Sequence, residues 1–220
     1  MKKGDVVWIA ALIGVIVFLI LPTTHKAFID VTTSYPYIAG FLKFAILATM
    51  GDLLAYRLVT SEWKIRKGFL FRAFIWGFLG IVIVLIFNIF GTGVANAMKA
   101  GLLPGEGYQL AFAFFTSTIM NLSFAPAMMG FHRITDTYAD LKFIQGRKNL
   151  TLKKVSNEVD WDNFISFVVF KTIPLFWIPA HTITFLLPPE YRVLMAAFLS
   201  IALGAILSFA KAKNIQRKKE

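Results

Sequence analysis

Residues 69–90 read FLFRAFIWGFLGIVIVLIFNIF, a nearly unbroken run of aliphatic and aromatic side chains with one charge near its start. Hydrocarbon about 30 Å thick requires roughly 20 apolar residues in a helix that rises 1.5 Å per residue. The run is therefore long enough to cross a membrane. The composition agrees, because 57% of the 220 residues are hydrophobic and only 16% are charged, which is too apolar for an ordinary soluble domain.

Five further apolar stretches flank this run, and together they predict an all-α, polytopic transmembrane helix bundle with six spans. The predicted spans are residues 6–21, 37–56, 69–90, 108–129, 164–187 and 191–210. The one long connection, residues 131–162, is polar, and we expect a single integral membrane domain over residues 1–220. A secretory signal is the alternative for residues 6–21, but no small-residue cleavage site follows them.

Basic residues are distributed unevenly over the segments that six spans leave. Of the 23 Lys and Arg residues, 18 lie in or beside the N-terminal segment, the second and fourth connections and the C-terminal tail, and three lie in the other connections. Basic loops stay on the cytoplasmic side of a membrane. The pattern predicts that both termini are cytoplasmic, in a bacterial cytoplasmic membrane or an organelle membrane.

The net charge of +11 would suggest nucleic acid as the partner of a soluble protein. Here the excess lies beside the spans, so the expected partner is a lipid bilayer with anionic headgroups, and no nucleic acid. The chain has no cysteine, and its three histidines, His25, His132 and His181, show no metal-ligand spacing. It also contains no nucleophile elbow, zinc motif or phosphate-binding loop, so we expect no metal, no cofactor and no enzymatic activity.

Four ionisable residues fall inside the predicted spans: Lys43, Asp52, Lys171 and His181. A charge in a span costs from ~2.5 kcal/mol upward, so each requires a partner or a hydrated cavity. At 1.5 Å per residue, Asp52 and Lys171 lie at similar depth and could pair, and Lys43 and His181 share a depth nearer the outer face. Alternatively, Lys171 snorkels to the headgroups, Asp52 pairs with a nearby arginine and His181 only joins two helices.

Polar and helix-breaking residues distinguish the fourth and fifth predicted spans. Thr116, Ser117 and Asn121 form a polar belt in the fourth, and these residues either line an aqueous path or allow close helix packing. Pro174 and Pro179 interrupt the fifth and free backbone carbonyls, which persist at depth only where protein or water satisfies them. The fifth span is therefore the expected wall of a hydrated cavity.

Several short motifs occur in a fixed order between residues 36 and 210. Their positions are Pro36, Gly51, Asp52, Arg72, Pro126, Pro188, Tyr191 and Arg192. In order and spacing, this part of the chain resembles the family of the mitochondrial inner-membrane protein Mpv-seventeen and the peroxisomal membrane protein of twenty-two kilodaltons. It departs from the family at Tyr56, where a glutamine is usual, and at Met120-Asn121, where Asp-Gln is usual. Residues 6–21 would be a helix additional to four or five family-like spans.

The resemblance implies a small helical membrane protein for which a solute-conducting pore has been proposed. Together with the polar residues, it leads us to expect a channel-like or permeability protein for small, anionic solutes. The expected lining residues are Lys43, Asp52, Thr116, Ser117, Asn121, Lys171 and His181. The alternative is a non-conducting structural or assembly factor in which these residues hold helices together. Both alternatives are compatible with a homo-oligomer.

Overall fold

The structure, a computed structural model, describes the backbone of residues 2–217 and the side chains of residues 2–206. The basic residues 211–219, on which part of the charge argument rests, lie outside the described side chains. Within residues 2–217 the chain is helical and contains no β-strand. Its helical segments are α1 (Lys3–Ile20), α2 (Pro22–Ser34), α3 (Pro36–Thr60), α4 (Phe69–Lys99), α5 (Gln109–Ser123), α6 (Ala125–Ala139), η1 (Asp140–Ile144), α7 (Leu152–Asn157), α8 (Trp161–Asn163), η2 (Phe164–Trp177), α9 (Ile178–Leu186) and α10 (Pro189–Arg217).

Five helices of the described chain are long and apolar enough to cross a membrane. They are α1, α3, α4, the continuous helix Trp161–Leu186 formed by α8, η2 and α9, and the Pro189–Ile206 part of α10. The pair formed by α5 and by α6 with η1 is a further candidate, bent by 48°. The prediction of an all-α chain with several membrane-length helices is confirmed.

The structure divides the predicted span at residues 108–129 into two helices that meet at a bend. Helix α5 ends at Ser123 after 15 residues, too few to cross about 30 Å of hydrocarbon, and α6 begins with Pro126 in its first turn. Proline lacks a backbone N–H and clashes with the preceding turn, so the helix breaks there. The second half of the bent pair then continues to Ile144, well into the region expected to be a polar connection.

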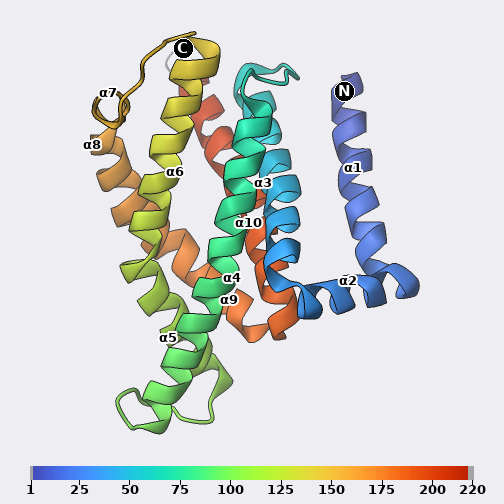
Figure 1. Ribbon diagram of the computed structural model, residues 1–220, viewed down its shortest axis with the longest axis vertical. Helices are drawn as coiled ribbons and strands as arrows, with labels where there is room; N and C mark the ends of the chain where they lie inside the picture. Colours follow the sequence, from blue (N-terminus) through green and yellow to red (C-terminus); the bar gives the residue numbers. More distant parts are fainter. Residues whose placement is uncertain (1, 218–220) are drawn as a thin grey trace.

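The segment between the first two predicted spans is also helical. Helix α2 starts at Pro22, whose fixed φ suits the first helical position, and it buries Phe28. In Figure 1 this helix links the lower ends of α1 and α3 and runs roughly perpendicular to both, while α4 and α5 extend beyond it. A short helix with mixed polarity in this orientation is typical of the membrane interface.

Helix α3 lies at the centre, packed along α4 and α10. At its contact with α4, Gly40 faces Gly80 so closely that a Cβ on Gly80 would lie 2.3 Å from the carbonyl oxygen of Gly40. At its contact with α10, a Cβ on Gly51 would lie 3.2 Å from the Cα of Ile201. Small residues at both crossings let the backbones approach, as in many membrane helix pairs.

Helix α1 stands apart from the bundle and buries none of its residues (Figure 1). Its first turns are nevertheless fixed to α3 and the loop that follows α3. The Asp5 carboxylate accepts hydrogen bonds from Arg57 at 2.8 Å and from the indole of Trp63 at 2.7 Å, and Trp8 donates to the carbonyl of Met50 at 3.0 Å. The start of α1 and the basic loop 61–68 therefore share one end of the bundle, here called the basic end, and α2 lies at the other end.

Candidate functional site

A cavity of about 250 Å³ lies in the middle of the bundle, and we call it the central cavity. It is enclosed by α3, α4, α5, α6, α10 and the continuous helix formed by η2 and α9. Most of its wall is apolar. Its polar wall residues are Asp52, Trp76, Asn121, His132, Trp177, His181 and Ser200. A mostly apolar cavity with a few convergent polar groups is the usual form of a small-molecule site.

Asp52 lies on the side of the central cavity nearer the basic end. Its carboxylate accepts a hydrogen bond from the indole of Trp76 at 2.9 Å. The imidazole of His132 packs on the same indole, with ring centroids 4.2 Å apart. His132 was missed as a site residue, because its charged neighbours placed it in the expected polar connection. The sequence contained one signal for His132. Proline suits the first turn of a helix, and a helix that begins near Pro126 would include His132 six residues later.

Asn121 and His181 form a buried polar pair deeper in the same cavity. The Asn121 amide is hydrogen-bonded to Nδ1 of His181 at 3.0 Å, and it also donates to the carbonyl of Ser117 at 2.8 Å. Asn121 is 0% exposed and His181 is 8% exposed. The ring of His181 stacks on Trp177, with centroids 5.1 Å apart, so packing and hydrogen bonding both fix its orientation.

Two polar atoms on the cavity wall have no hydrogen-bond partner among the described residues. They are the indole N–H of Trp177 and Nδ1 of His132, and both are buried. An unsatisfied buried polar group costs about 1–3 kcal/mol, so native proteins normally pair such groups or hydrate them. Both residues thus carry an unpaired polar atom next to the central cavity.

Thr116 and Ser117 lie behind the cavity wall. Both are fully buried, between α5 and the η2–α9 helix, and neither lines the central cavity. Ser117 donates to the carbonyl of Ile178 at 2.7 Å, just after the stretch that Pro174 distorts. Of the two roles left open, its geometry is that of a packing residue that joins two helices.

The two lysines of the predicted spans lie away from the central cavity. Lys171 is exposed on the outer face of η2 and has no hydrogen-bond or ion-pair partner among residues 2–206, so the expected pair with Asp52 does not form. Lys171 lies in η2, a π-helix of 14 residues that contains Pro174, and its exposure agrees with the alternative in which it reaches toward the headgroups. Lys43 faces a different cavity, between α1, α2 and α3.

The side of the central cavity facing the basic end adjoins two smaller spaces. One, of about 180 Å³, shares His132 and Met129 with it and reaches Arg133 and Asp136. Between them and the loops, Arg72 is 6% exposed and forms ion pairs with Asp136 and with Asp140, the latter at 2.7 Å. These pairs join the start of α4 to the end of α6, and they explain why charged residues occur in a helix where the sequence indicated a loop.

Aromatic rings pack at the opposite side of the central cavity. Phe185 is fully buried, and its ring lies 4.9 Å from that of Phe87. Arg192 covers this contact: its guanidinium donates to the carbonyl of Leu187 at 2.9 Å and lies 5.5 Å from the ring centroid of Phe185. Phe87 lines the cavity, and Phe185 and Arg192 pack behind it.

The remaining motif positions occupy helix starts and contacts between elements. Pro36 is the first residue of α3, Pro126 lies at the bend between α5 and α6, and Pro188 directly precedes α10. The hydroxyl of Tyr191 is hydrogen-bonded to Nε2 of His25 at 3.1 Å, which ties α10 to α2. Two motif positions line the central cavity: Gly51, which also lies at a helix crossing, and Asp52. The other motif positions serve the architecture.

The apolar helices define the class of molecule, a helical protein compatible with several membrane crossings. Searches against protein-family models, curated proteins and solved structures find no match to this chain. Within the described residues, no group of three or more His, Cys, Asp or Glu side chains could hold a metal ion.

Proposed function

We propose that this chain is a multi-pass membrane protein with six crossings, both termini on the cytoplasmic side, that lets small polar solutes permeate through the central cavity. The sixth crossing is the bent pair of α5 and α6, which passes the length and apolarity test as a unit. The orientation rests on the basic loops, which lie at the end where α1 starts. The proposal agrees with the resemblance to the Mpv-seventeen family.

The observation that supports permeation is the set of polar groups inside the bundle. Asp52, His132, Asn121 and His181 come from four different helices and meet around one cavity. Polar residues inside membrane segments are expensive and usually mark a solute or ion path. Trp177 and His132, which also line the cavity, each carry a buried polar atom without a partner among the described residues.

The charges around the central cavity favour neutral or cationic solutes over anions. Its ionisable wall residues are one carboxylate, Asp52, and two imidazoles, and no Lys or Arg of the described chain lines it. Charged side chains that line a path set its selectivity. The preference for anions expected from Lys43 and Lys171 loses its basis, since both lie elsewhere. We therefore propose small uncharged polar molecules as the solute class.

Cysteine substitution offers a direct test of hydration, because the chain contains no native cysteine. Ser200→Cys places a thiol on the central cavity, and Ser117→Cys places one in the dry contact behind it. We expect a membrane-impermeant thiosulfonate reagent to modify Cys at position 200 from the basic end and to leave position 117 unmodified. Equal modification of the two thiols, or modification of neither, would contradict a hydrated cavity.

Flux measurements test permeation itself. In proteoliposomes, stopped-flow shrinkage with a small polyol is expected to be faster than in empty liposomes. Asn121→Leu should slow it by about tenfold, because it removes a buried hydrogen-bonding group worth about 1.5 kcal/mol to a passing solute. Lys171→Gln is the matched control and should leave the rate unchanged, since that side chain is exposed on the outer face.

A non-conducting structural or assembly factor is the second candidate, favoured by the aromatic contact of Phe87 and Phe185 at one side of the cavity. It predicts that wild-type proteoliposomes shrink no faster than empty ones. It also predicts that Asn121→Leu changes only the unfolding temperature. Rapid wild-type flux that Asn121→Leu slows would exclude this candidate.

A further inference from the structure

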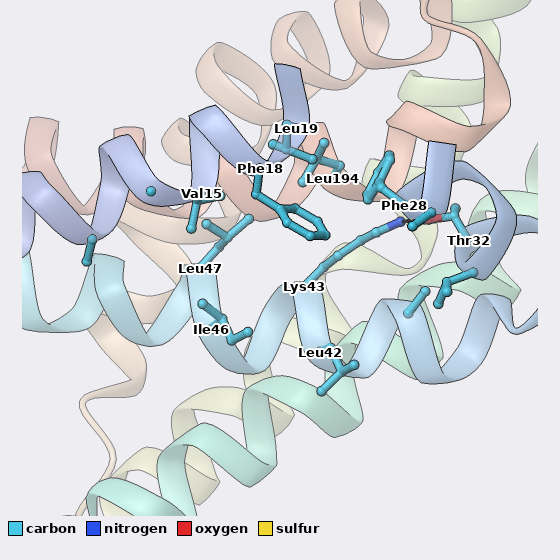
Figure 2. Close-up of a pocket in the computed structure, with 15 residues that line it drawn as sticks. Val15, Phe18, Leu19, Phe28, Thr32, Leu42, Lys43, Ile46, Leu47 and Leu194 are labelled. Carbon is cyan, nitrogen blue, oxygen red and sulfur yellow. Dashed lines mark hydrogen bonds between the residues drawn. The ribbon is translucent and has the colours of Figure 1, made fainter. Parts of the chain in front are cut away.

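A second cavity, of about 570 Å³, lies between α1, α2 and α3, and we call it the lateral cavity. Figure 2 shows Val15, Phe18 and Leu19 of α1 on one side and Leu42, Ile46 and Leu47 of α3 on the other. The walls separate beyond the first turns of α1, where Asp5 and Trp8 are hydrogen-bonded to Arg57 and Met50 of α3. Leu42 and Ile46 are 49% and 51% exposed, so the cavity opens sideways toward the lipid.

Lys43 is the one charged residue of the described chain that lines the lateral cavity, and it is only 9% exposed. Its side chain extends toward α2 (Figure 2), where the ammonium donates to the hydroxyl of Thr32 at 2.8 Å and lies 4.5 Å from the ring centroid of Phe28. Among the described residues, no carboxylate lies within 4.0 Å of it. The ammonium has three N–H donors, of which one is hydrogen-bonded to Thr32 and one can point at the ring face, so at least one remains for another acceptor.

We propose that the lateral cavity binds one anionic phospholipid, with an acyl chain between α1 and α3 and the phosphate beside the Lys43 ammonium. The apolar walls match the chain, and the opening faces the bilayer from which the lipid comes. The uncompensated charge matches the head, and it lies next to α2, the helix whose orientation is that of the membrane interface. The Thr32 hydroxyl is a second donor for the phosphate. This site does not depend on permeation through the central cavity.

The acyl-chain part of the proposal is tested by filling the cavity. Gly14 lines it, and a Cβ built there has no atom within 4 Å, so Gly14→Phe adds a ring without a backbone clash. Gly93→Phe is the matched control, since a Cβ at Gly93 also meets nothing within 4 Å and this residue lies on α4 outside the cavity. Native mass spectrometry of the purified full chain should show phosphatidylglycerol retained by wild type and Gly93→Phe, and largely lost from Gly14→Phe.

The headgroup part is tested at Lys43 with the same readout. Wild type is expected to retain phosphatidylglycerol about tenfold better than phosphatidylcholine, the size of one charge-assisted hydrogen bond. Lys43→Gln should remove this preference while some lipid of either kind stays bound, Lys43→Arg should keep it, and Lys171→Gln should leave it at the wild-type value. Inorganic phosphate should not compete, because it lacks the acyl chain.

Three results would overturn the proposal. The first is equal retention of the two lipids by wild type. The second is an unchanged preference in Lys43→Gln, and the third is full lipid retention by Gly14→Phe. Gly93→Phe and Lys171→Gln carry the same chemical changes elsewhere on the protein. A loss of lipid that occurs in the test variant and not in its control is therefore specific to the lateral cavity.

Discussion

Gly80→Ala is expected to lower the unfolding temperature of the purified protein more than any other single change considered for the bundle. The added methyl group would lie 2.3 Å from the carbonyl oxygen of Gly40 and 2.9 Å from Cβ of Phe44, so α3 and α4 must move apart along their contact. Forcing extra volume into a packed contact typically costs about 1–3 kcal/mol, and backbone against backbone leaves little room to relax.

The matched control for this change is Gly93→Ala on the same helix, where the new methyl group meets nothing within 4 Å. Thermal unfolding followed by size-exclusion chromatography measures both variants in the same detergent. Gly93→Ala should unfold at the wild-type temperature or slightly above it, since alanine is the better helix former. Equal unfolding temperatures for the two variants would contradict the close crossing of α3 and α4.

The second large effect is expected when both carboxylates that pair with Arg72 are removed. Arg72 is 6% exposed, but the side chains of Asp136 and Asp140 are 33% and 40% exposed. The double change Asp136→Asn and Asp140→Asn therefore leaves a buried guanidinium without its partners, which costs about 3–5 kcal/mol for a fully buried pair and less here because water reaches the acids.

Arg72→Met should be milder, because the two carboxylates that it leaves unpaired can be hydrated where they are. The unfolding temperature should therefore be highest for wild type, lower for Arg72→Met and lowest for the double variant. Glu158→Gln provides the control, since its pair with Arg147 is about half exposed on both sides and exposed pairs contribute little. A lower unfolding temperature for Arg72→Met than for the double variant would contradict the argument that the buried, unpaired guanidinium causes the loss of stability.

The long apolar helices could be predicted from the sequence because hydrocarbon imposes a length and a composition on every helix that crosses it. The helix at residues 69–90 was found in this way, although α4 continues to Lys99. The bend between α5 and α6 was missed, because the apolar residues continue past Pro126 without a gap although the helix changes direction there. Helix α2 was missed because its polar residues suit an interface as well as a loop.

The candidate site could be predicted only in part. Asp52, Asn121 and His181 do meet around one cavity, and their cost inside a span was the signal that identified them. Lys171 was a candidate partner of Asp52 from its depth alone, and depth does not specify the direction of a side chain; the structure places it on an exposed side of η2. His132 was missed because its helix was not expected. Which helices pack together is a tertiary property, which apolar periodicity does not specify.

The attachment of α1 also bears on the order of assembly during biogenesis. Met50, Arg57 and Trp63, which hold Trp8 and Asp5, are synthesised after α1. Until then the contacts that fix α1 cannot form, and from Val6 to Ile20 the helix carries no charged side chain. The docking of α1 would then follow the synthesis of α3 and of the loop after α3.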